Sequence, residues 1–174
     1  MTLVIIPPPP LTARLVFMAT PESWLSRVVM FDTEGAVSHV AAMMDDGLFM
    51  SANYGQGVRR TRDIDELAGV KMQISVDLPM PWPQYAKWRD YLYSQNGKPF
   101  DTEALAGNAL HWDISTRGAL YCAQLQTAAL RYCDYFARPL AQKWHMITPV
   151  VLLLMLQAQP LSTGVVVHEA ESEG

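Results

Sequence analysis

Apolar and polar residues alternate with a period of two along several segments of the chain. Segment 11–18 is apolar and β-branched, segments 36–44 and 48–54 flank an Asp-Asp-Gly turn at residues 45–47, and segment 71–78 alternates strongly. Because successive side chains of a strand point to opposite faces, this pattern predicts β-strands. Two further short extended segments are expected at residues 58–60 and 165–167.

Helical spacing of apolar residues predicts helices over residues 21–31, 83–94, 119–136 and 148–157. The first is preceded by Thr20 as N-cap and starts with Pro21, and the last begins at Thr148 in the same way. No linker or repeat divides the chain. We therefore predict one α+β domain over residues 1–174, of which residues 1–10 are a Pro-rich N-terminal extension.

Composition excludes several classes of protein. Half of the 174 residues are hydrophobic and 17% are charged, which is typical of a compact globular domain and not of a disordered chain. The net charge of −4 gives no basic excess, so we expect no nucleic-acid partner. No signal peptide or transmembrane segment is visible, and we expect synthesis in the cytoplasm. Composition leaves the oligomeric state and the final compartment open.

Two cysteines are the candidate nucleophiles. Cys122 falls at the start of predicted helix 119–136, where unpaired N–H groups and the helix dipole favour a thiolate. Cys133 is three turns further on, where we expect a buried apolar thiol. The two are too far apart on one helix for a disulfide. Taken alone, Cys122 is compatible with a structural role and with a catalytic one.

Four histidines are present, and His39 has the most informative surroundings. It lies in the middle of predicted strand 36–44, on the same face as Ala41 and Met43. Alone, it could be a hydrogen-bonded core residue or a catalytic base. No pair of histidines or cysteines has zinc-ligand spacing, so we expect neither a metal nor a cofactor.

Five short motifs follow one another in a recognisable order. They are Ser38-His39-Val40, Asp46-Gly47, Gly57-Val58, Gly97-Lys98-Pro99-Phe100-Asp101 and Cys122-Ala123-Gln124-Leu125. Together they resemble the circularly permuted papain-like thiol hydrolases of the NlpC superfamily, including YiiX-like proteins and the lecithin–retinol acyltransferase group. The resemblance covers residues 15–156. It departs from the family pattern at Phe100, which replaces Tyr, and at Ala123-Gln124, which replaces Ser-Glu.

The resemblance implies both a fold and a reaction. The fold would be an antiparallel sheet or small barrel packed against helices, with the cysteine at a helix N-terminus. Cys122 would attack a carbonyl group, and His39 would act as acid and base. The implied function is a cysteine amidase or peptidase, with cell-wall peptides as the family's commonest substrate. Two alternatives are an ester or lipid acyl hydrolase or acyltransferase, and a binding scaffold such as a virion component.

A third polar residue is expected to orient the imidazole. If residues 45–47 form a three-residue turn, Met44 pairs with Leu48 and His39 falls opposite Asn53. Ser51 then shares the face of His39 and aligns best with the family's third residue, which is often Glu. We therefore predict Cys122, His39 and Ser51 as catalytic residues, with Asn53 as the alternative third member.

Overall fold

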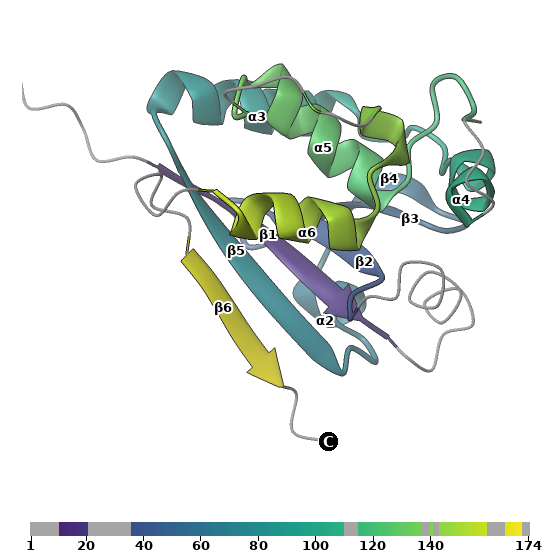
Figure 1. Cartoon of the computed structure of the whole chain (residues 1–174), viewed down its shortest axis with the longest axis horizontal. Coiled ribbons are helices and arrows are strands. Elements are labelled where there is room, and N and C mark those ends of the chain that lie inside the picture. Colours follow the sequence, from purple (N-terminus) through teal and green to yellow (C-terminus); the bar gives the residue numbers. More distant parts are fainter. Residues whose placement is uncertain are drawn as a thin grey trace, which may run out of the picture.

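The computed structural model describes residues 11–20, 36–109, 115–136, 140, 143–159 and 166–171. Within these ranges the chain forms a six-stranded antiparallel sheet in the order β4-β3-β2-β1-β5-β6, with helices packed against it (Figure 1). The predicted α+β class is thus confirmed. The predicted helix 21–31 and the N-terminal extension 1–10 lie outside the described residues.

All the predicted strands are present. Their bounds are β1 (Leu11–Ala19), β2 (His39–Met43), β3 (Phe49–Asn53), β4 (Gly57–Thr61), β5 (Met72–Met80) and β6 (Val166–Glu171). Met44 N–H donates to the Leu48 carbonyl over 2.8 Å, which confirms the register expected for the β2–β3 hairpin.

Strand β5 is longer than predicted, because Pro79 does not end it. Pro79 pairs with Thr12 of β1, while the pairing of β5 with β6 covers only Met72 to Asp77. Proline cannot donate a hydrogen bond to a neighbouring strand, and it is tolerated where one side of a strand is unpaired. The far end of β5 provides such a position.

The described helices are α2 (Asp63–Glu66), α3 (Trp82–Ser94), α4 (Thr102–Ala109), α5 (Cys122–Tyr132) and α6 (Pro149–Gln157), with a 3-10 turn, η1, at Trp144–Met146. Helices α3 and α6 match the predictions. Helices α2 and α4 are additions that the sequence pattern did not predict. Helix α2 has only four residues, and its apolar residue, Ile64, is exposed, so it carries no apolar periodicity to detect.

Helix α5 is shorter than the predicted helix 119–136, and the difference matters for the site. It begins at Cys122 itself, so the cysteine occupies the first helical position. It ends at Tyr132, after which Asp134 adopts a positive φ of 57° and Tyr135 N–H donates to the Leu130 carbonyl over 2.9 Å. This left-handed residue with a backward hydrogen bond is a common helix stop.

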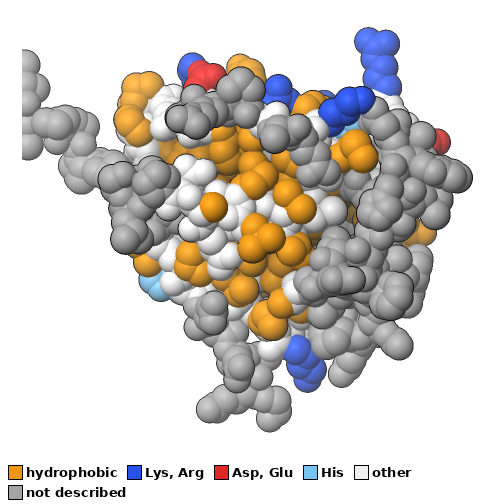
Figure 2. Space-filling model, in the orientation of Figure 1, with side chains coloured by type: hydrophobic (Ala, Val, Ile, Leu, Met, Phe, Trp, Pro, Cys, Tyr) orange, Lys and Arg blue, Asp and Glu red, His pale blue; other side chains and the backbone are white. Residues whose placement is uncertain are grey.

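The main core lies between the sheet and helices α3, α5 and α6 (Figure 1), and a smaller apolar cluster on the sheet packs against Leu67 and Val70, which follow α2. Apolar side chains gather over the face on which α6 lies (Figure 2), and Leu154 of this helix remains 59% exposed. None of the described helices is both long and apolar enough to cross a membrane.

Candidate active site

His39, Glu66 and Cys122 come together although they lie far apart in the sequence. Nε2 of His39 is 2.9 Å from Oε1 of Glu66, and Glu66 is the last residue of α2. The imidazole is also close enough to Cys122, at the N-terminus of α5, for this cysteine to raise the pKa of the histidine. A histidine held between a cysteine and a carboxylate is the arrangement used to activate a nucleophile and orient its base.

The β2–β3 hairpin positions His39, at the start of β2, and Asn53, at the end of β3. The recorded pairs between β2 and β3 are Ala42 with Met50 and Met43 with Phe49. Continuing this register places His39 opposite Asn53, as the sequence predicts, at the end of the hairpin away from its turn. Asn53 Nδ2 donates to Oε2 of Glu66 over 3.1 Å. His39 and Asn53, which lie opposite each other, therefore both contact the carboxylate of Glu66.

Glu66 is held by several donors. Its Oε2 accepts from Thr61 Oγ1 at 2.5 Å and from Asn53 Nδ2, and Ser51 also hydrogen-bonds the carboxylate. Asn53 Nδ2 in addition donates to Ser51 Oγ over 3.0 Å. The Glu66 side chain is only 2% exposed. A buried carboxylate with this many donors is fixed in place and favoured in its charged form.

Burial and charge shift the pKa values of His39 and Glu66 in opposite directions. Burial lowers the pKa of His39, but the charge of Cys122 and hydrogen bonds to Cys122 and Glu66 raise it, to about 10 from 6.5. Burial raises the pKa of Glu66, while the hydrogen bond and charge of His39 and the hydrogen bonds from Thr61 and Ser51 lower it, to about 2 from 4.5. A protonated His39 beside an ionised Glu66 is therefore the favoured state at neutral pH.

A buried polar cluster fixes the start of α5. Gln124 Oε1 accepts from Tyr121 N–H over 2.9 Å, and its Nε2 donates to the His145 carbonyl at 3.2 Å and to Asp101 at 3.5 Å. Asp101 is fully buried and also accepts from the N–H groups of Ala104 and Thr116. The amide of Gln124, which stands where the family pattern has Glu, donates to two acceptors and accepts from one N–H group.

The motif Gly57-Val58 and the motif at residues 97–101 meet at the outer edge of β4. Val58 N–H donates to the Lys98 carbonyl and Gly97 N–H donates to the Val58 carbonyl, each over 2.8 Å. Gly57 has a φ of +74°, and a Cβ there would lie 2.3 Å from the Lys98 carbonyl oxygen. Leu120 N–H then donates to the Pro99 carbonyl over 3.0 Å. Segment 97–101 thereby connects β4 to the residues that precede Cys122.

A hollow of about 300 Å³ opens beside His39. We call it the catalytic hollow; its lining includes His39, Asn53, Tyr54, Gln56, Asp65 and Glu66. Cys122 is only 6% exposed and is not among the lining residues, so little of this residue is open to solvent.

The structure brings the predicted Cys122 and His39 together and adds Glu66, which the sequence analysis missed. The contacts of predicted Ser51 run to Glu66 and Asn53, so the carboxylate stands between Ser51 and the imidazole. Glu66 lies 27 residues from His39, on a helix too short to be recognised. The available signal was the acidic run Asp63, Asp65 and Glu66 after the strands, together with the glutamate that the family resemblance implies.

The sequence also contains a second cysteine and further histidines. Cys133 is buried, as predicted, and burial raises the pKa of its thiol to about 11. His168 lies at the far edge of the sheet, 3.4 Å from Asp77. His111 is outside the described residues.

Fold and site together define an α+β protein in which a helix-terminal cysteine contacts a histidine that is bound to a carboxylate. The fold is similar to a crystal structure described as metalloprotein yiiX from Escherichia coli O157:H7. The TM-score is 0.60 and the identity 14%, and the match covers 94% of this chain and 98% of that one. The chain therefore has a YiiX-like fold. No family model and no curated protein matches its sequence.

The neighbouring structure is described as a metalloprotein. Among the described residues, no group of three or more His, Cys, Asp and Glu side chains is arranged to hold a metal ion.

Proposed function

We propose that this protein is a cysteine-dependent hydrolase that cleaves amide bonds through a permuted papain-like site. The observation that carries the proposal is the position of His39, which is 2.9 Å from Glu66 and close enough to Cys122 for this cysteine to raise its pKa. Because Glu66 takes Nε2 of the imidazole, we assign Nδ1 to the sulfur. Glu66 is the orienting residue in this proposal, and Ser51 supports Glu66.

Each residue has a defined part in the reaction. The Cys122 thiolate attacks the carbonyl carbon, a C–S bond forms, and the carbonyl oxygen becomes an oxyanion beside the N-terminus of α5. Protonated His39 gives its proton to the leaving nitrogen as the C–N bond breaks, which leaves a thioester. Neutral His39 then takes a proton from water, whose oxygen attacks the thioester. The C–S bond breaks, the acid is released, and the thiolate is restored beside protonated His39.

Electrostatics support this assignment of roles. The raised pKa of His39 keeps a proton on the ring at neutral pH, ready for the leaving nitrogen. The Glu66 carboxylate, with its lowered pKa, stabilises that imidazolium and fixes the ring. A merely structural histidine would not need a buried carboxylate held by three polar side chains.

Acyl-enzyme formation tests the proposal. The protein is mixed with p-nitrophenyl acetate, and nitrophenolate release is followed together with the mass of the peptide that contains Cys122. We expect a burst of nitrophenolate and an acetyl group on Cys122, followed by slow turnover, with no burst in Cys122→Ser. Acetylation elsewhere, or a burst that survives in Cys122→Ser, would contradict the proposal.

A second experiment distinguishes amide hydrolysis from acyl transfer to acceptors other than water. Turnover of acylated peptides in water is compared with turnover in the presence of added alcohols and amines. Hydrolysis predicts the free acid as the product throughout. Accumulation of the transferred acyl group would instead identify an acyltransferase.

A further inference from the structure

A second hollow adjoins the catalytic one. It has a volume of about 480 Å³ and lies between the turn after β3 and the segment at residues 97–102. We call it the Lys98 hollow; its lining is Tyr54, Gly55, Gln56, Gly57, Gly97, Lys98, Pro99, Phe100 and Thr102. Tyr54 and Gln56 line both hollows, so the two are neighbours across one turn.

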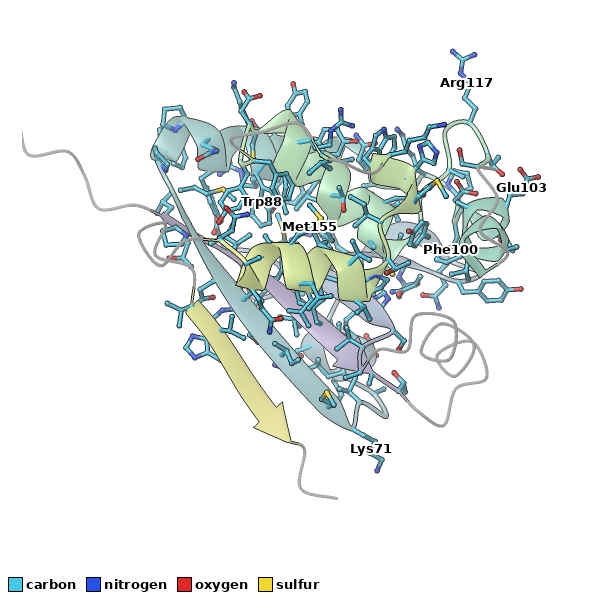
Figure 3. All side chains as sticks on the ribbon, in the orientation of Figure 1. Lys71, Trp88, Phe100, Glu103, Arg117 and Met155 are labelled. Atoms are coloured by element: carbon cyan, nitrogen blue, oxygen red, sulfur yellow. The ribbon has the colours of Figure 1, made fainter. Side chains whose placement is uncertain are left out.

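The Lys98 hollow is tied to the start of the cysteine helix. The Pro99 carbonyl accepts from Leu120 N–H, and Asp101 N–H donates to the Leu120 carbonyl, two residues before Cys122. Figure 3 shows Phe100 close to α4, and its ring meets that of Tyr54 edge-on, with centroids 5.7 Å apart. The hollow therefore has an aromatic wall formed in part by a segment that is hydrogen-bonded to Leu120, two residues before Cys122.

Charge distinguishes the two hollows. The catalytic hollow is lined by Asp65 and Glu66, whereas Lys98 is the charged residue among those lining the other. Lys98 Nζ donates to the neutral Gln95 amide at 2.6 Å, and no described carboxylate forms an ion pair with it. A half-buried ammonium with a neutral partner keeps its positive charge available to an anion. In the catalytic hollow the carboxylate of Glu66 is paired with His39, so Lys98 offers an anionic group a cation that is not already paired with a carboxylate among the described residues.

We infer that the Lys98 hollow selects the substrate of the proposed hydrolase. The substrate class is an acylated amino acid or short peptide with an apolar or aromatic side chain next to a free carboxylate. The side chain packs on Tyr54 and Phe100, and the carboxylate pairs with Lys98. This inference rests on the proposed function, and it adds the chemistry of the group beside the scissile bond.

Alkylating probes test the inference at Cys122. N-chloroacetyl-phenylalanine carries the aromatic ring and the carboxylate, and N-chloroacetyl-phenylalaninamide lacks the charge. In each, the Cys122 thiolate displaces chloride and forms a thioether, which mass spectrometry quantifies. We expect the carboxylate probe to label Cys122 about fivefold faster than the amide, as a surface ion pair allows. Equal labelling rates of the two probes would overturn the inference.

Two variants identify the group that is responsible. Lys98→Ala should remove the preference for the carboxylate probe without changing labelling by the amide probe. Lys87→Ala is the matched control, because Lys87 lies on α3 and pairs with Asp134, beyond the opposite end of α5 from Cys122. A preference that persists in Lys98→Ala, or disappears in Lys87→Ala, would contradict the assignment.

A binding measurement keeps the hollow testable apart from catalysis. Binding of N-acetyl-phenylalanine and of its amide to Cys122→Ser is followed by calorimetry, with and without Lys98→Ala. Tighter binding of the carboxylate that depends on Lys98 supports the inference even if the thiol proves unreactive. Absence of any difference overturns the inference and leaves the proposed hydrolase chemistry untouched.

Discussion

At the scale of single residues, the site consists of one charged contact and the groups that maintain it. The Glu66 side chain is almost fully buried, and Thr61, Asn53 and Ser51 hydrogen-bond it while it faces His39. Burying a charge is costly unless it is paired and hydrogen-bonded. The number of donors therefore explains how a carboxylate persists here and why it holds the imidazole so firmly.

Replacing Glu66 should change how stability depends on pH. The folded-state pKa of Glu66 is lowered, so its contribution is complete above about pH 4.5 and is lost as the pH falls toward 2. The lowering corresponds to roughly 3 kcal/mol. Urea unfolding across this range should show a steep acid loss in the wild type and a flatter one in Glu66→Gln. Asp65→Asn, which removes a half-exposed charge from the same helix, should keep the wild-type slope.

His39 should determine how the free energy of unfolding depends on pH in the basic range. Its folded-state pKa is raised, so its contribution is complete below about pH 6.5 and disappears as the pH rises through about 10. Unfolding measured between pH 6 and 10 should therefore show a loss of stability in the wild type that is absent in His39→Ala. Parallel curves for the two proteins would argue against the charged pair.

Variants of Ser51 and Glu66 distinguish the residue that orients the imidazole from the residue that supports it. Ser51→Ala removes one hydrogen bond to Glu66, worth about 1 kcal/mol. We expect alkylation of Cys122 to slow by only about fivefold, and by much more in Glu66→Gln. If Ser51→Ala and Glu66→Gln were equally slow, Ser51 would itself be the third member of the site.

At the scale of elements, short connections position the reacting groups. Segment 97–101 pairs with the edge of β4 on one side and with Leu120 on the other, and so connects the sheet to the start of α5. Cys122 is the first residue of that helix, where unpaired N–H groups can meet a developing negative charge. The geometry of the site thus depends on the close approach of Gly57 to Lys98.

Two glycines in one turn make a matched test of that approach. Gly55 and Gly57 have nearly the same φ, +75° and +74°, but a Cβ at Gly55 meets open space while one at Gly57 meets the Lys98 carbonyl. Gly55→Ala should lose about 1 kcal/mol of unfolding free energy through backbone strain alone. Gly57→Ala should lose at least about 2 kcal/mol more. Equal losses in thermal or urea unfolding would mean that the approach is not tight.

At the scale of the whole molecule, the alternation of side chains predicted the sheet well. The strands, their antiparallel order at the β2–β3 hairpin and the cysteine helix follow from local pattern and turn composition. Local pattern could not predict Glu66, because α2 has only four residues with no buried apolar side chain, and Glu66 lies 27 residues from His39. It also misjudged the ends of α5, which depend on the left-handed Asp134 and on the contacts of Gln124.

Stability of the sheet should be separable from the chemistry of the site. Asp77 on β5 accepts two hydrogen bonds from Arg14, at 2.6 and 2.8 Å, and also contacts His168 at the far edge. Asp77→Asn should lower unfolding free energy by about 1 kcal/mol at neutral pH. Alkylation of Cys122 should be unchanged. A change in its rate would mean that the two ends of the sheet are coupled.

The most direct test of the central claim is the rate of iodoacetamide alkylation at Cys122 as a function of pH, in the wild type and in His39→Ala. Cys133, buried with a raised pKa, provides an unreactive internal control that mass spectrometry resolves. We expect Cys122 to be alkylated rapidly at neutral pH and His39→Ala to abolish this reactivity. Slow labelling with the pH profile of an ordinary thiol, unchanged in His39→Ala, would contradict the paired nucleophile and with it the proposed hydrolase.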